Sequence, residues 1–85
     1  MKRKEVEKLR DEYLRMTQFL HNLPNRYARL RRAKEAEAIY ERLLDEAIKI
    51  RGVNYGKFIS TFQLINEGDK TSIIDALCWA ATEAE

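Results

Sequence analysis

The chain has 85 residues, of which 45% are hydrophobic and 35% are charged. This length allows one domain, spanning residues 1–85, with a thin core, and the composition excludes a disordered chain. The net charge of +2 conceals an asymmetry: residues 1–34 carry 11 Lys or Arg against 4 Asp or Glu, whereas residues 35–85 carry 5 against 10. Such a split favours association with an acidic partner or with a second copy of the chain.

Cysteine usage and the N-terminal residues indicate the compartment. Cys78 is the only cysteine, which excludes an internal disulfide and fits a reducing environment. No apolar run follows the basic N-terminal residues, so we expect neither a secretory signal nor a membrane-spanning segment. The prediction is a cytoplasmic protein without a membrane partner, of the size of many phage or mobile-element accessory proteins.

The first half of the chain predicts a pair of long helices. Residues 3–22 carry apolar side chains at alternating steps of three and four, which places them on one side of a helix. These side chains are Val6, Leu9, Tyr13, Met16, Leu20 and Leu23. Pro24 ends this helix, and Asn25 is expected to cap the next one. The second helix, residues 26–51, ends at Gly52 and is apolar over about half its circumference, so it should pack against more than one neighbour.

Two shorter helices are predicted after a turn at residues 53–56. Residues 57–66 are ambiguous, because Phe58, Phe62 and Ile65 fit a helical stripe and are also typical of a strand. A lone strand would have no pairing partner here, which favours a helix. Ser72 and Asp75 resemble a capping box that begins a last helix at residues 73–84. The predicted fold is all-α, a long antiparallel helical hairpin capped by two shorter helices.

Residue types that carry catalysis or bind metals are scarce. His21 and Cys78 are the only His and Cys, whereas a structural zinc site needs four nitrogen or sulfur ligands. Cys78 falls on the apolar arc of the last helix, where a free cysteine usually packs as a small hydrophobe. Residues 68–72 depart from a phosphate-binding loop, since Gln63 stands where that motif has its first glycine. We expect no cofactor, no metal and no enzymatic activity.

An arginine group marks the start of the second predicted helix. Arg26, Arg29 and Arg32 fall within about 120° of arc centred on the apolar stripe, and Tyr27 and Arg31 are interleaved with them in the sequence. In a functional interpretation this edge binds nucleic acid or an acidic partner, with Tyr27 stacking on a base. Alternatively, the arginines are solvated or pair with acids of the second half. The small net charge and the acidic second half argue against nucleic acid.

Trp79 is the second unusual residue, because it falls on the polar side of the last helix. Tryptophan is enriched at interface hot spots, so an exposed Trp79 predicts a contact surface. Further candidates on exposed helix faces are Leu14, Asp75 and Glu83. Alternatively, Trp79 folds back over a neighbouring helix within the monomer.

These features lead to one functional hypothesis and one alternative. The first is a non-enzymatic protein-binding module (an adaptor, inhibitor or assembly factor) that forms a homo-oligomer, with a dimer favoured. The alternative is a small nucleic-acid-binding protein that uses the arginine-rich end of the hairpin.

Overall fold

The computed structural model describes residues 1–18, 20–65 and 69–83. Helices account for 87% of these residues and no strand occurs among them, which confirms the all-α prediction. The ambiguous segment after the second helix is therefore helical over its described part. No helix within the described ranges is both long and apolar enough to span a lipid bilayer.

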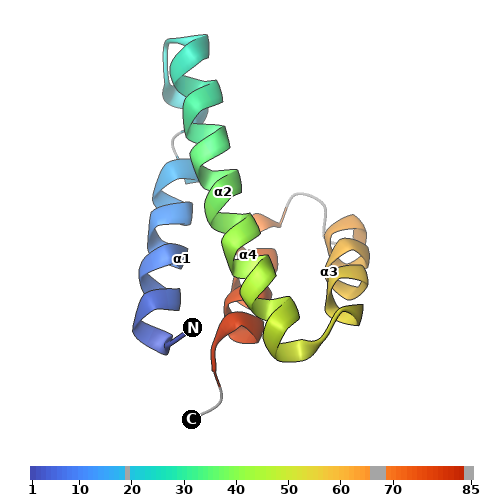
Figure 1. Ribbon diagram of the computed structural model, residues 1–85. Coiled ribbons are helices and arrows are strands. Elements are labelled where there is room, and N and C mark those ends of the chain that lie inside the picture. Colours follow the sequence, from blue (N-terminus) through green and yellow to red (C-terminus); the bar gives the residue numbers. More distant parts are fainter. Residues whose placement is uncertain (19, 66–68, 84–85) are drawn as a thin grey trace.

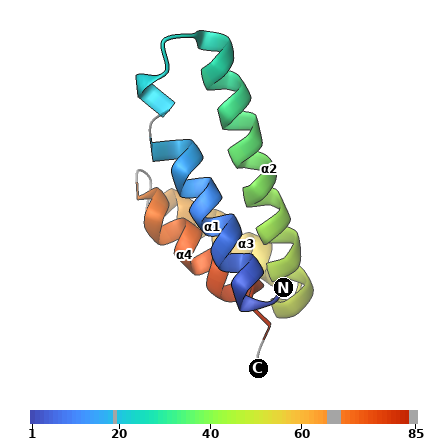
Figure 2. The same cartoon turned by 90° about the vertical axis from the view of Figure 1, so that its left-hand side faces the viewer.

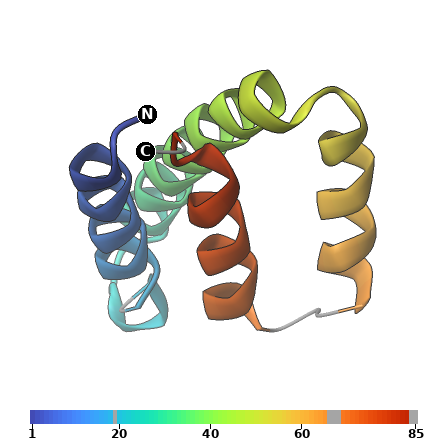
Figure 3. The ribbon, with the colours of Figure 1, turned by 90° about the horizontal axis from the view of Figure 1, so that it is seen from below.

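The helices form a hairpin with two shorter helices at one end. The elements are α1 (Arg3–Gln18), the 3-10 turn η1 (Leu20–Asn22), α2 (Arg26–Arg51), α3 (Asn54–Ile65) and α4 (Lys70–Ala81). Helices α1 and α2 run side by side in opposite directions, and α4 packs against both (Figures 1 and 2). Helix α3 lies on the other side of α4, at the edge of the molecule (Figure 3). The hairpin end, formed by η1 and the first turns of α2, extends beyond α3 and α4 (Figures 1 and 2).

Several predicted boundaries are corrected. Helix α1 ends at Gln18, and a 3-10 turn follows where we expected the helix to continue. Helix α3 begins at Asn54 and not at residue 57, because the turn is confined to the residues just after Gly52. Helix α4 begins at Lys70 and ends at Ala81. Residues 19, 66 and 84, which fall in the predicted helices, lie outside the described part of the chain.

The helix caps follow local chemistry. The Asn25 side chain accepts a hydrogen bond from the Tyr27 N–H at 2.8 Å, as predicted. Gly52 ends α2 with its N–H bonded to the Ile48 carbonyl, and its φ of 97° and ψ of 167° lie in a region that is essentially restricted to glycine. The cap of α4 differs from the prediction, because Asp69 accepts the Ser72 N–H at 3.1 Å. Ser72 is thus the donor of this cap and not the capping residue.

The core lies where α4 packs against α1, α2 and α3. Its largest fully buried side chains are Leu43, Ile59, Ile74 and Leu77. Helix α4 contributes much of the core through its predicted apolar arc, which confirms that arc over the described residues. Of the predicted α3 stripe, Phe62 packs half-buried against the core, whereas Phe58 is 54% and Ile65 is 77% exposed. The buried side chain of this helix is Ile59, which lies beside the stripe.

Candidate binding surfaces

Trp79 is 67% exposed on the outer side of α4, so it does not fold back into the monomer core. The guanidinium of Arg51, the last residue of α2, lies over the indole, with its carbon 4.2 Å from the ring centroid. This cation–π contact contributes about 0.5–1 kcal/mol at an exposed site and covers one face of the ring. The rest of the indole remains accessible.

A hollow of about 430 Å³ between α1 and α4 borders Trp79. It is lined by Arg3, Val6, Glu7, Arg10, Cys78, Trp79 and Thr82. Arg10 donates a hydrogen bond to Asp75 at 2.5 Å, which joins α1 to α4 and raises the pKa of the Arg10 guanidinium above its ordinary value. Glu83 lies 3.4 Å from the amino group of Met1. Charges of both signs therefore surround the tryptophan.

Leu14 belongs to a different part of the surface. It is half-buried against the core and lines a separate hollow with Thr17, Gln18 and Thr71, near the start of α4. Trp79 is near the opposite end of the same helix. The structure thus brings Trp79 close to the Asp75–Arg10 pair, whereas Leu14 lies one helical turn beyond Arg10, on the side away from Trp79.

Exposed apolar side chains on α3 extend this outer surface. The Phe58 ring lies 5.5 Å from that of Tyr55 and 6.0 Å from that of Phe62. Tyr55 is tied to α4, because its hydroxyl donates to the Ala76 carbonyl at 3.2 Å. Burial raises the pKa of Tyr55, and the positive charge of Arg51 opposes that rise, so Arg51 lies near both Tyr55 and the indole of Trp79.

Sequence reasoning missed the exposure of α3, although one signal was available. Phe58, Leu64 and Ile59 fall on three different sides of this helix, so a single neighbour cannot bury them all. Leu64 and Ile65 are both exposed. We call the exposed side chains of Phe58 and Trp79, with Tyr55 and Arg51 between them, the outer α3–α4 surface.

The predicted arginine group lies on the hairpin end. Arg26, Arg29, Arg31 and Arg32 are all exposed, and Tyr27 is 80% exposed. None of the four arginines forms an ion pair with an acid of the described residues. The sequence explains this locally, because it contains no Asp or Glu from residue 13 to residue 34. The alternative that these arginines pair with acids of the second half finds no support in the described part.

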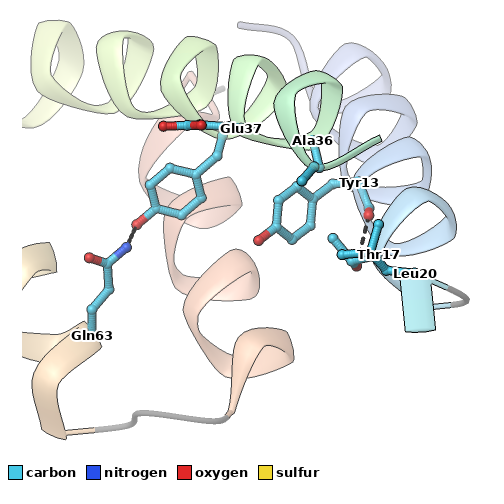
Figure 4. Close-up of a pocket in the computed structure, with 8 residues that line it drawn as sticks. Tyr13, Thr17, Leu20, Ala36, Glu37 and Gln63 are labelled. Carbon is cyan, nitrogen blue, oxygen red and sulfur yellow. Dashed lines mark hydrogen bonds between the residues drawn. The ribbon is translucent and has the colours of Figure 1, made fainter. Parts of the chain in front are cut away.

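Two neighbouring hollows form a groove along α2. The first, of about 480 Å³ at the hairpin end, is lined by Leu20, Arg26, Arg29, Leu30 and Ala33. The second, of about 260 Å³, is lined by Tyr13, Thr17, Leu20, Ala33, Ala36, Glu37, Tyr40 and Gln63 (Figure 4). Leu20 and Ala33 line both hollows, so the two are adjacent, and we call them together the α2 groove.

The walls of the α2 groove come from three helices and the η1 turn. Tyr13 of α1 and Gln63 of α3 face it from opposite sides (Figure 4). Gln63 donates a hydrogen bond to the Tyr40 hydroxyl, which ties α3 to α2. Burial raises the pKa of both Tyr13 and Tyr40, so these phenols are neutral at physiological pH.

The described residues offer little reactive chemistry on these surfaces. Burial raises the pKa of the Cys78 thiol to about 11, so it is protonated at neutral pH. No group of three or more His, Cys, Asp or Glu is arranged to hold a metal ion within the described ranges. The side chain of His21 lies outside the described part. Comparison of the chain with protein-family models, with curated proteins and with solved structures gives no match.

Proposed function

We propose that this chain is a non-enzymatic protein-binding module, an adaptor, inhibitor or assembly factor, that self-associates through the outer α3–α4 surface. The observation that carries the proposal is the exposure of Trp79 and of Phe58, which Arg51 and Tyr55 link at the surface. Large apolar side chains gathered on one surface mark protein contact sites, because burying them removes apolar area from water. Tryptophan is among the residues that contribute most at such sites.

The charges around this surface support a second copy as the occupant. A two-fold dimer places the same patch of both copies face to face. Arg51 lies over the indole, and Arg10, paired with Asp75, lines the adjacent hollow with Glu7, so signs can be matched across such a contact. The hairpin end would instead set arginine against arginine, which is repulsive.

The test is replacement of the indole. Trp79→Ala should weaken dimerisation at least tenfold, about 1.4 kcal/mol, because an interface tryptophan often contributes 2 kcal/mol or more. Sedimentation equilibrium measures the dissociation constant, and the emission of the single tryptophan should shift to the blue as the dimer forms. Tyr27→Ala is the matched control, since it removes an exposed aromatic side chain from the hairpin end and should leave dimerisation unchanged.

Two outcomes would contradict this proposal. In one, the wild-type chain stays monomeric at the highest attainable concentration. In the other, Tyr27→Ala weakens dimerisation as much as Trp79→Ala does, which would move the contact to the hairpin end. Far-UV circular dichroism of both variants verifies that the helices remain.

The exposed arginines favour a second candidate function, the binding of nucleic acid by the hairpin end. Replacing Arg26, Arg29 or Arg32 with alanine should then weaken binding to any nucleic-acid sequence. Each replacement should also reduce the slope of log K against log salt by about 0.7–1 for every phosphate that the protein no longer neutralises. A wild-type chain without salt-dependent binding at low ionic strength would eliminate this candidate.

A further inference from the structure

We infer that the α2 groove binds an amphipathic helical segment of a partner protein, with acidic residues at the end of that segment that lies against Arg26 and Arg29. The inference rests on the proposed function only in treating the chain as a protein-binding module. It concerns a different surface from the outer α3–α4 surface and does not depend on self-association.

The shape of the groove fits a helix. It follows α2 from Arg26 to Tyr40, which is a rise of about 21 Å, or roughly four helical turns. Apolar atoms line most of it, supplied by Leu20, Leu30, Ala33, Ala36 and the two tyrosine rings. An amphipathic helix occupies such a groove with apolar side chains spaced at i, i+3 or i+4 and i+7.

The positive charge at the hairpin end favours an anionic ligand. Arg26 and Arg29 line the groove without an acidic partner among the described residues. They also occupy the beginning of α2, where the helix dipole is positive and where the first turn contains no acid. Cations at this position oppose the dipole, so the arrangement costs stability in the free chain. Local patterns that cost stability are expected at functional sites, and a partner carboxylate would relieve this one.

The remaining lining residues favour a peptide over nucleic acid. Glu37 lies in the wall of the second hollow, where it would repel a phosphate backbone that followed the groove. Leu30 is 52% exposed beside the two arginines, and an apolar side chain offers little to phosphates. A helical peptide with acidic residues at one end and an apolar stripe along its length complements both the arginines and the apolar lining of the groove.

The experiment uses synthetic helical peptides of about 15 residues, labelled with a fluorophore and titrated with the full chain. One peptide carries a leucine stripe and three glutamates at one end, a second replaces those glutamates with lysines, and a third has the stripe scrambled. Fluorescence anisotropy should show binding of the first peptide at least tenfold tighter than of the other two. A single-stranded oligonucleotide of equal length should bind more weakly and without dependence on Leu30.

Matched variants locate the contact. Arg29→Glu should weaken binding of the acidic peptide at least tenfold. Arg31→Glu makes the same charge change on the same helix but lies outside the groove lining, so it should have at most a twofold effect. Leu30→Ala should weaken binding severalfold without any change in charge.

A stability measurement separates a binding role from a structural one. Because Arg29→Glu removes a cation from the positive end of the dipole, it should raise the melting temperature by roughly 2–4 °C while it weakens binding of the acidic peptide. The inference is overturned by equal effects of the two arginine variants, by no binding of the acidic peptide at low salt, or by tighter binding of the oligonucleotide. Trp79→Ala should bind the peptide normally, so failure here and failure of self-association are distinguishable.

Discussion

Helices α3 and α4 have the same length, 12 residues each, yet they differ in how deeply they are buried. Helix α4 lies between α1 and α3 and against α2, and it buries Ile74, Leu77, Cys78, Ala80 and Ala81. Helix α3 lies at the edge and buries Ile59 (Figure 3). The comparison shows that an apolar helix becomes core only where neighbours surround it, and that the same kind of sequence at an edge becomes a contact surface.

Residue size and capping account for part of the difference. The small side chains of Ala80 and Ala81 let α4 approach its neighbours closely, and both are fully buried. Asp69 caps the start of α4 with hydrogen bonds from the Ser72 N–H and hydroxyl. The residue before α3 is Val53, whose side chain has no acceptor. Helix α3 is therefore held less firmly than α4, both by side-chain packing and by capping of its first turn.

The largest expected effect is on core packing. Leu77→Ala in α4 should lower the free energy of unfolding by about 3 kcal/mol, because it removes buried methyl groups and leaves a cavity. Ile65→Ala in α3 should cost less than about 0.5 kcal/mol at concentrations where the chain is monomeric. Urea unfolding followed by circular dichroism measures both. Equal costs would mean that α3 is as much a part of the core as α4.

Thiol reactivity also tests the contrast between the burial of α4 and the exposure of α3. The raised pKa of Cys78, about 11 against an ordinary 9.0, should slow its alkylation at pH 8 about a hundredfold relative to a free thiol. A thiol placed on α3 by Ile65→Cys in a Cys78→Ala background should react at the free rate. Because the unfolded thiol ionises first, the contribution of Cys78 to stability is complete below pH 9 and disappears between about pH 9 and 11. Rapid alkylation of native Cys78 would contradict its burial.

The smallest effect concerns the α4 cap. Hydrogen bonds from the Ser72 hydroxyl and N–H lower the pKa of Asp69 below its ordinary 3.8. The stability that this carboxylate contributes is therefore present above about pH 4 and disappears as the pH falls through the lowered value. Asp69→Asn, which keeps a capping side chain without a charge, should be slightly less stable near neutrality. Its unfolding midpoint should also depend less on pH between 2 and 5, and an unchanged pH dependence would refute this role.

Short-range rules were sufficient for much of the fold. Asn25 caps the start of α2 and Gly52 ends it, as expected, because capping depends on a few neighbouring atoms. The exposure of the arginines agrees with the solvated form of the alternative weighed from the sequence, and the absence of Asp and Glu from residue 13 to residue 34 explains it. The position of Trp79 on its helix was readable from the spacing of α4, whereas its contact with Arg51 was not, because it depends on how the end of α2 lies against α4.

What sequence reasoning missed depends on distant contacts. The α2 groove exists because Leu20 of η1 and Gln63 of α3 meet the same stretch of α2. No periodicity within one helix reveals such a meeting. The burial of Ile59 in place of Phe58 has the same origin, because it depends on the direction in which the chain leaves α2.

That direction is set at Gly52, whose backbone dihedral angles are strained for L-amino acids. It is the one residue in the described ranges with a positive φ, and a Cβ built there meets nothing within 4 Å. Space therefore does not restrict the position, but chirality does: an L-residue is strained there, whereas a D-residue has its own extended region at these angles. The link between the hairpin and the edge helix thus requires the one achiral amino acid, and any L-substitution would bias α3 away from the place where it closes the groove and presents the outer surface.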